Sequence, residues 1–445
     1  MNKWLLVLCL FSITSLLQAQ SPDVVIYPRP REDTKLAVVD FVPRTAATQT
    51  VQAAVRVFNK VLWDDLEFSA FFEMPSKSFY PLKPLRSPME VNFDNWQVPT
   101  LDVDFLIFGN LQLASGVTVV EAYLYDVRTR DQVLGKRYTI SDSALTQSVA
   151  HEFADQVVFQ LSAGTSRGVA RAKIAFSSLK GDSKEVYVMD YDGANQRVIT
   201  ANGGLNKFPE WSADSSKLAF ITNLPESSRW ELWIQDLNGG RTILPVPTSY
   251  VSSPAFAPDG TKIAFSSREV NGMDAGIYMA DLDGGNLRNL SNHPSIDTSP
   301  SWSPTGRQIA FISDRSGSPQ LWVMDADGSN LQILVTEGGH CDSPNWSPDG
   351  RLIAYSWQAP GQWKHDIYVI EVATEKVFQL TSGRGSNENP HWSPDGRHLT
   401  FQSTRTGSKQ IFVMNADGRQ IRQVTAYGMN ESPAWSGYPA TDSQE

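Results

Sequence analysis

The sequence predicts a multidomain protein in which an N-terminal α+β domain precedes an all-β, six-bladed propeller closed by the C-terminal strand. Two observations predict this fold class. A proline–x–aromatic unit recurs six times in the C-terminal two thirds of the 445-residue chain, and too little chain follows its last copy to form another blade. The N-terminal third lacks the unit and mixes helical with strand periodicity.

The recurring unit begins with proline and has Trp or Phe two positions later. Its copies begin at Pro209, Pro254, Pro300, Pro344, Pro390 and Pro433, a period of 43–46 residues. A period of this length is typical of one four-stranded propeller blade. Proline cannot donate to a strand ladder and so begins a strand, and the aromatic side chain fills the space between neighbouring blades.

Two turn motifs complete the unit. Ser-Pro-Asp-Gly at 347–350 and 393–396 follows the first strand, and Asp-x-Asp-Gly at 190–193, 281–284 and 325–328 follows the third. Proline, Asp and Gly are the residues that turns require. Asp-x-Asp-Gly also opens calcium loops, but an EF-hand loop needs further oxygen ligands and a later Glu, so these motifs are interpreted as hairpin turns.

The two ends of the repeat predict how the ring closes. Residues 174–176 form a second-strand motif with no proline unit before it, and residues 433–436 form a first-strand motif with almost nothing after it. Pairing these two segments completes a sixth blade and removes two exposed strand edges.

Four regions are predicted along the chain: a signal peptide over 1–19, a flexible arm over 20–33, the α+β domain over 34–166 and the propeller over 169–440. The apolar run at 4–17 is too short to span a bilayer and ends in Ala19, where we expect cleavage. A lipoprotein interpretation based on Cys9 is disfavoured by Leu8 before it. Cleavage leaves Cys341 as the single cysteine, so no internal disulfide is expected.

Within the α+β domain, residues 36–41 are predicted to form a buried strand, and Val51 to Leu62 have the spacing of an amphipathic helix. Three alternating segments between residues 103 and 140 predict an antiparallel meander. A second helix is expected to be capped by Ser143. Residues 75–100 are rich in proline, and the sequence does not assign their fold.

Charge and catalytic motifs narrow the function classes. With 38 Lys and Arg against 48 Asp and Glu, the net charge of −10 disfavours a nucleic-acid partner. The nucleophile-elbow pattern at 164–168 lies after a predicted helix rather than after a strand, so it is interpreted as a linker.

No pair among the six histidines has a recognised zinc spacing. Three arginines that recur after the second strand, Arg268, Arg315 and Arg405, keep a sialidase-like hydrolase as an alternative.

The loops that enter each first strand are expected to converge on one mouth of the central channel. The candidate partner-binding residues lie two and three positions before the prolines: Asn206, Asp297, Thr298, Asp342, Asn387, Glu388, Asn430 and Glu431. The four acidic residues predict an acidic rim. It is either a set of solvated loop ends or a recognition face for a basic or polar partner loop, with room for a cation such as calcium in the channel.

Taken together, these features resemble the TolB family of the Tol–Pal envelope system. The resemblance rests on the exported N-terminus, the strand at 36–41, Leu-Ile-Phe-Gly at 106–109, Asp-Tyr-Asp-Gly-Ala-Asn at 190–195 and Ser-Pro-Ala-Trp-Ser at 432–436. It covers nearly the whole chain after the signal peptide.

The resemblance implies a non-catalytic, monomeric periplasmic adaptor that needs no cofactor. In this family the propeller mouth binds the lipoprotein Pal, and the N-terminal arm binds the inner-membrane protein TolA. Carried onto this chain, the second role falls on Asp23, Val24, Val25 and Ile26. The implied function is to support outer-membrane integrity and envelope constriction during cell division, with association to the outer membrane through Pal. A hydrolase and a glycan-binding propeller remain alternatives.

Overall fold

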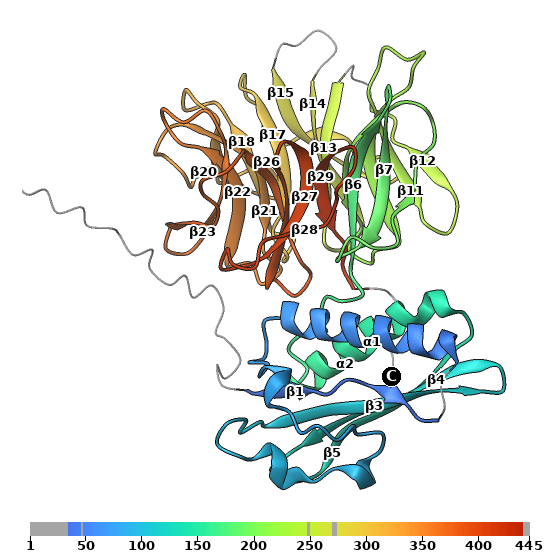
Figure 1. The fold of residues 1–445 in the computed structure, drawn as a ribbon. Helices are drawn as coiled ribbons and strands as arrows, with labels where there is room; N and C mark the ends of the chain where they lie inside the picture. Colours follow the sequence, from blue (N-terminus) through green and yellow to red (C-terminus); the bar gives the residue numbers. More distant parts are fainter. Residues whose placement is uncertain (1–33, 46–47, 247–249, 269–273, 439–445) are drawn as a thin grey trace, which may run out of the picture.

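The computed structural model describes residues 34–45, 48–246, 250–268 and 274–438. A β-propeller and an α+β domain are stacked, and two helices of the α+β domain lie between its sheet and the propeller (Figure 1). The predicted signal peptide and arm, residues 1–19 and 20–33, lie outside the described residues. No helix in the described ranges is long and apolar enough to cross a membrane.

The α+β domain is a mixed sheet covered on one face by two helices. The strand order is β1-β3-β4-β5; β1 and β2 run parallel to β3, and the remaining pairs are antiparallel. The elements are β1 Leu36–Val38, β2 Val42–Pro43, α1 Gln49–Phe68, β3 Phe105–Ala114, β4 Val117–Asp126, β5 Gln132–Ile140 and α2 Thr146–Leu161.

Local sequence determines where the helices begin. The Thr48 hydroxyl accepts a hydrogen bond from the Val51 N–H at 3.3 Å and caps α1. Val51, Phe58 and Leu62 then face the sheet and are buried, as their spacing predicts. The second helix differs from the prediction: Ser143 begins a short 3₁₀ turn, η4 (Ser143–Leu145), and α2 starts at Thr146 without a side-chain cap.

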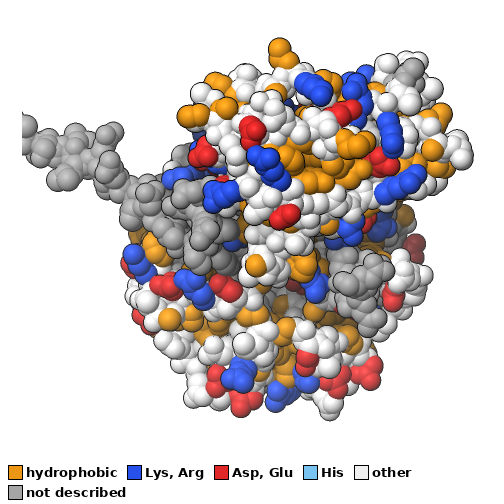
Figure 2. Space-filling model, turned by 90° about the horizontal axis from the view of Figure 1, so that it is seen from below, with side chains coloured by type: hydrophobic (Ala, Val, Ile, Leu, Met, Phe, Trp, Pro, Cys, Tyr) orange, Lys and Arg blue, Asp and Glu red, His pale blue; other side chains and the backbone are white. Residues whose placement is uncertain are grey.

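The proline-rich segment at 75–100 covers the other face of the sheet. It forms three 3₁₀ turns, η1 Lys77–Phe79, η2 Pro88–Glu90 and η3 Phe93–Trp96. Leu85 and Trp96 pack with Leu106 and Phe108 in a small separate core. Viewed from below, the molecule shows hydrophobic side chains on its surface with Lys and Arg side chains nearby (Figure 2).

The propeller contains six four-stranded blades, as the period predicted. Four blades are separate sheets and two are joined in one eight-stranded sheet. The strands of the first blade are β9 Leu205–Trp211, β10 Lys217–Asn223, β11 Glu231–Asp236 and β12 Arg241–Ile243. Those of the next two are β13 Tyr250–Phe256, β14 Lys262–Arg268, β15 Ala275–Asp281 and β16 Arg288–Asn289, then β17 Asp297–Trp302, β18 Gln308–Ser313, β19 Gln320–Asp325 and β20 Gln332–Ile333. The following two comprise β21 His340–Trp346, β22 Leu352–Gln358, β23 Asp366–Glu371 and β24 Lys376–Gln379, then β25 Asn387–Trp392, β26 His398–Thr406, β27 Ser408–Asn415 and β28 Arg422–Gln423.

The remaining blade combines the two ends of the repeat. It contains β29 Met429–Trp435, β6 Lys173–Lys180, β7 Ser183–Asp190 and β8 Arg197–Val198. Strand β29 pairs antiparallel with β6, and Trp435 lies opposite Ile174. The chain end therefore supplies the inner strand of a blade whose other strands directly follow the α+β domain (Figure 1).

Every inner strand contains a bulge at the residue before its proline. The bulged residues have positive φ of 48–54°: Phe208, Ser253, Ser299, Ser343, Asn389 and Ser432. The ladder register shifts at this point in all six blades. A non-glycine residue at positive φ is strained by about 1–2 kcal/mol, so neighbouring contacts must stabilise it.

Hydrogen bonds between blades supply such contacts. The backbone N–H groups of Ser299 and Asn389 each donate at 3.0 Å to a serine hydroxyl on the second strand of the preceding blade. The aromatic residue of the unit is tied to the preceding blade as well. The indole N–H of Trp392 donates to the Asn345 carbonyl at 3.2 Å, and its backbone N–H donates to the Asn345 side chain at 2.8 Å.

Buried polar and aromatic contacts join the two domains. Asp65 of α1 lies 2.7 Å from both His151 Nδ1 on α2 and the Tyr191 hydroxyl of the propeller. The His398 ring stacks on Phe68 with centroids 4.2 Å apart, and its Nε2 bonds the Phe68 carbonyl at 2.6 Å. The Asp-Tyr-Asp-Gly turn at 190–193 is thus a hairpin turn that also contacts the neighbouring domain. One hydrophobic core continues from α1 and α2 into β6, β7, β27 and β29.

Removing β29 should destroy the cooperative unfolding of the ring, because β6 then loses its inner neighbour and its strand edge becomes exposed. We expect a chain ending at Gly428 to show a broad, low-temperature transition in differential scanning calorimetry. A chain ending at Tyr438, which loses only residues 439–445, is the control and should unfold like the full chain. A sharp transition at the original temperature in the shorter chain would contradict the role given to β29.

The stability of the domain junction should fall as pH rises. Burial lowers the pKa of His151, but the nearby carboxylates Asp65, Asp192 and Asp190 outweigh burial and raise it above its ordinary 6.5. When folding raises the pKa of a group, the protonated group stabilises the folded protein. This contribution is complete at pH values below the pKa of the unfolded chain, and it is lost as the pH rises through the pKa of the folded protein.

We therefore expect His151→Gln to reduce the free energy of unfolding by roughly 1.5–3 kcal/mol near pH 5.5, the range of hydrogen bonds to charged groups, and by less at pH 9. Urea denaturation of both proteins across this range measures the difference. Gln196→Ala, at an exposed turn position, is the control and should show no such trend. A difference that is constant with pH would contradict protonation of His151 at the junction.

Candidate functional site

The candidate site is the channel lined by the six inner strands. The turn between β25 and β26 faces the α+β domain, since Arg397 lies 3.8 Å from the centre of the Phe71 ring. The starts of the inner strands therefore lie at the mouth farthest from that domain (Figure 1). The predicted partner-binding residues all stand near these starts.

Half of the predicted residues are buried inside the propeller wall rather than on the rim. Asn206, Asp297 and Asn387 are 0% exposed and Asn430 is 1% exposed. Adjacent residues of a strand point to opposite faces, so residues two and three positions before a proline cannot share the channel surface. The third position back points into the gap between blades, and this corrects the predicted rim.

The buried residues hold neighbouring blades together. Asn387 Nδ2 donates to Asp366 Oδ1 at 2.8 Å, and the Thr381 hydroxyl donates to the same oxygen at 3.0 Å. The same arrangement recurs with Asn430, Gln410 and Thr425. A buried amide must be hydrogen-bonded, and these bonds give the asparagines a structural role.

Two of the recurring arginines are also engaged within their blades. Both carboxylate oxygens of Asp297 accept from Arg315 Nη2, at 3.0 and 3.1 Å. Arg405 Nη2 donates to Asn387 Oδ1 at 2.8 Å. Arg268 lies near the ring of Tyr250, 5.6 Å from its centroid. Arg315 and Arg405 are therefore already bonded to side chains of their own blades, whereas a carboxylate-binding hydrolase site needs arginines that are free to bind the substrate.

The other predicted residues, Thr298, Asp342, Glu388 and Glu431, are half-buried. With Lys207 and Ser252 at the equivalent positions of β9 and β13, they form a six-membered set that we call the mouth ring. Glu388 Oε2 lies 3.4 Å from Lys409 Nζ, and Glu431 forms an ion pair with Lys184. Lysines from third strands thus neutralise two of the carboxylates, and the mouth is not uniformly acidic.

Burial and neighbouring charges shift the pKa values of two groups in and beside this ring. Burial alone would raise the pKa of Glu388, but hydrogen bonds from Ser386 and Gln402 and the charge of Lys409 lower it below its ordinary value. Burial lowers the pKa of His365, which lies beside the ring, despite the nearby Glu388 and Asp342. Glu388 is therefore ionised, and His365 is neutral, near pH 7.

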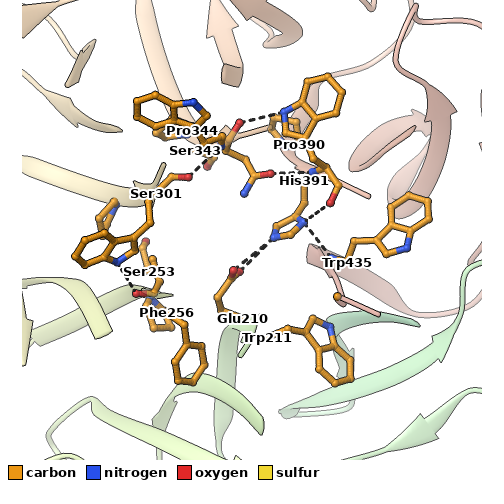
Figure 3. Close-up of a pocket in the computed structure, with 18 of the residues that line it drawn as sticks. Glu210, Trp211, Ser253, Phe256, Ser301, Ser343, Pro344, Pro390, His391 and Trp435 are labelled. Atoms are coloured by element: carbon orange, nitrogen blue, oxygen red, sulfur yellow. Dashed lines mark hydrogen bonds and ion pairs between the residues drawn. The ribbon is translucent and has the colours of Figure 1, made fainter. Parts of the chain in front are cut away.

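Deeper in the channel, the residue after the proline lines the cavity in five of the six repeats. His391 of β25 and Glu210 of β9 approach each other there, with Nε2 3.5 Å from both carboxylate oxygens (Figure 3). The Trp435 backbone N–H and the Trp392 carbonyl oxygen each lie 3.1 Å from His391 Nδ1, and these contacts hold the ring with Nε2 toward Glu210. Strand β29 lies between β25 and β9 in the ring, and the pair therefore spans part of the channel.

The channel encloses a cavity of about 300 Å³ around this pair. The prolines, the bulged residues and the aromatic residues of the six repeats line it (Figure 3). The volume is at the lower end of the range for small-ligand pockets.

One cluster among the described residues has the composition of a metal site. Ligand atoms of His151, Asp190 and Asp192 lie within 4.8 Å of one another at the domain junction. The Asp190 carboxylate already accepts from Lys173 Nζ at 2.5 Å and from Asn195 Nδ2 at 2.7 Å. A divalent cation would have to displace an ammonium group, so the cluster fits a structural network better than a metal centre.

The described nucleophile candidates are buried in structural positions. Ser166, in the pattern at 164–168, is 6% exposed, and its hydroxyl accepts from the Gly168 N–H at 3.1 Å. It follows a helix and precedes a strand, as the linker interpretation expected. Cys341 is fully buried, and burial raises the pKa of its thiol to about 12, so the thiolate that nucleophilic chemistry needs is scarce.

Several site residues were not predicted from the sequence. Glu210 and His391 follow the repeated prolines directly, so reading that position in every copy would have found them. Lys184 and Lys409 come from third strands, and nothing in the repeat indicates that they reach the mouth. Their contacts depend on how the blades stack.

Comparison with known proteins identifies relatives of the same architecture. A family model described as the TolB β-propeller domain matches residues 162–364 and 332–440. The Tol–Pal system proteins TolB of Bordetella pertussis and Bordetella parapertussis are each 29% identical over 235 residues, 52% of this chain and 52% of theirs. The chain thus spans about half the length of the curated relatives it matches.

A solved structure matches over more of the chain. The crystal structure of TolB from Acinetobacter baumannii superposes with a TM-score of 0.75 at 23% identity. The match covers 92% of this chain and 98% of that one. At this identity the likeness establishes the fold, which agrees with the domain order and the propeller predicted from the sequence.

Replacing Asp297 should destabilise the protein strongly, whereas replacing Asp342 should not. Asp297→Ala leaves Arg315 buried without its carboxylate, and breaking a buried pair costs about 3–5 kcal/mol. Asp342→Ala removes a half-buried carboxylate that has no ion pair among the described residues, and the cost should stay within about 0.5 kcal/mol. Chemical denaturation of both variants measures the two losses. Equal losses would contradict the division of the predicted residues into wall and rim.

Proposed function

The chain belongs to the TolB β-propeller family, and from that premise we propose that it is a non-catalytic periplasmic adaptor of the Tol–Pal system. Its role is to support outer-membrane integrity and envelope constriction during cell division by binding Pal and TolA. The family match over the propeller carries the proposal, and the two Bordetella relatives are named as Tol–Pal system proteins.

The channel mouth is the proposed Pal-binding surface. Its half-buried residues come from five of the six blades, and Ser252 of the remaining blade is buried; side chains arranged around one opening are a suitable surface for a protruding partner loop. The residues retained from the predicted rim are Thr298, Asp342, Glu388 and Glu431. The four buried residues stabilise the blades that carry these mouth residues: Asn206, Asp297, Asn387 and Asn430.

The proposed TolA-binding segment is the arm at Asp23, Val24, Val25 and Ile26, which lies outside the described residues. Binding of TolA through this segment would leave the propeller mouth free for Pal. The protein works as a monomer that associates with the outer membrane through Pal and engages no nucleic acid. A cation such as calcium in the channel stays a prediction, and among the described cavity-lining residues Glu210 is the carboxylate it would meet.

The absence of catalysis is part of the proposal. Arg315 and Arg405 bond within their own blades, and this weakens the sialidase-like alternative. The channel histidine lies against Glu210 and the Trp435 backbone, with no serine or cysteine nucleophile described beside it in the manner of a catalytic triad.

Lysine substitutions at the mouth should weaken the binding of Pal. We expect the variant Asp342→Lys, Glu388→Lys, Glu431→Lys to lose at least roughly tenfold in affinity, because like charges across an interface are costly. Isothermal titration with the soluble domain of Pal from the same cell measures the affinity. Deleting residues 20–33 is the control and should leave Pal binding intact while removing TolA binding. Undiminished Pal binding by the triple variant would contradict the assignment of the mouth.

A further inference from the structure

We propose that the mouth of the channel is bipolar and takes a partner loop with an acidic side chain for Lys207 and a basic side chain for Asp342. This inference rests on the proposed binding of Pal at the mouth and adds the charge order of the loop that binds there. It replaces the uniformly acidic rim that the sequence predicted.

The polarity follows from the order of the blades. The mouth ring runs Lys207, Ser252, Thr298, Asp342, Glu388 and Glu431, one residue from each successive inner strand. In a six-membered ring the first and fourth members stand opposite each other. Lys207 and Asp342 therefore stand on opposite sides of the opening.

The two charges differ from the rest of the ring in their partners. Glu388 is paired with Lys409, and Glu431 is paired with Lys184, with Lys409 Nζ a further 3.9 Å from its second oxygen. Two carboxylates and two ammonium groups cancel on this side of the mouth. Ser252 and Thr298 are uncharged, so the net field of the ring comes from Lys207 and Asp342.

Lys207 has no ion pair among the described residues. Its ammonium lies 5.2 Å from the centre of the Trp230 ring, a contact that orients the side chain without neutralising it. Burial and the neighbouring Lys184 lower the pKa of Lys207, and Glu431 partly offsets them. An incoming carboxylate would relieve this repulsion, which favours an acidic group at this side.

Asp342 likewise has no cationic partner among the described residues. Its Oδ1 accepts from the Ser343 N–H at 2.7 Å and from the Ser299 hydroxyl at 3.3 Å. These neutral donors fix the carboxylate but leave its charge uncompensated. His365 stands nearby, but burial lowers its pKa and keeps the ring neutral. A lysine or arginine of the partner is the missing counter-charge.

The backbone holds both side chains in place before any partner arrives. Lys207 and Asp342 each precede a bulged residue of positive φ, Phe208 and Ser343. The bulged residues Phe208 and Ser343 line the cavity, and Lys207 and Asp342 beside them are half-buried at the start of their strands. A preformed pair of opposite charges gives orientation as well as affinity, because a loop inserted the wrong way round meets like charges.

The test reverses the charges singly and together. Lys207→Glu, Asp342→Lys and the swap variant Lys207→Glu/Asp342→Lys are titrated against the soluble domain of Pal from the same cell, at low and high salt. The swap variant keeps the net charge of the native chain and inverts only the polarity. Arg197→Glu and Asp131→Lys, both at exposed positions away from the mouth, make the same changes in net charge and serve as matched controls.

We expect each single reversal to weaken binding roughly tenfold or more, and the swap variant to be weaker than either single variant, with the losses shrinking at high salt. The controls should bind like the native chain. Native-like binding by the swap variant, or by both single variants, overturns the bipolar mouth while leaving Pal binding in place. Failure of the native chain to bind Pal overturns the proposed function, and the bipolar mouth falls with it. Melting temperatures establish that each variant is folded.

Discussion

The bulge before each repeated proline is the constraint on which the propeller depends. It places a non-glycine residue at positive φ in all six inner strands, and proline then prevents the strand from continuing its ladder in register. The strain is offset by hydrogen bonds from the bulged backbone to the preceding blade, such as Ser299 to Ser266. The same local feature therefore ties neighbouring blades together and places the bulged residues in the lining of the channel cavity.

Closure of the ring and docking of the α+β domain form one structural unit. Strand β29 completes the blade that begins with β6, and Trp435 belongs to the hydrophobic core shared with α1 and α2. Asp65 connects both domains through His151 and Tyr191 in a buried network. Because a buried network is costly to leave half satisfied, separating the domains would disturb the blade in which the ring closes.

Charge at the mouth illustrates why composition is a poor guide to a surface. The chain is acidic overall, with a net charge of −10, and its mouth residues include three carboxylates. Lysines from third strands form ion pairs with two of them, and Asp297 is buried in the propeller wall, where it pairs with Arg315. The charges left without an ion pair are one positive and one negative side chain on opposite sides of the mouth. The electrostatic field that a partner meets is thus a property of the assembled ring.

The sequence by itself determined the six-bladed architecture, the domain order and the pairing partners of its ends, because strand period, turn residues and proline positions are local features. It also placed Asp342, Glu388 and Glu431 at the mouth, since each stands two residues before a repeated proline. Only the tertiary structure decided that Asn206 and Asp297 are buried. Their exposure depends on which face of the strand they occupy, on the bulge that follows them and on the packing of the adjacent blade. The tertiary structure likewise decided the pairing of Lys184 with Glu431, because these two residues are far apart in the chain and meet only when the ring closes.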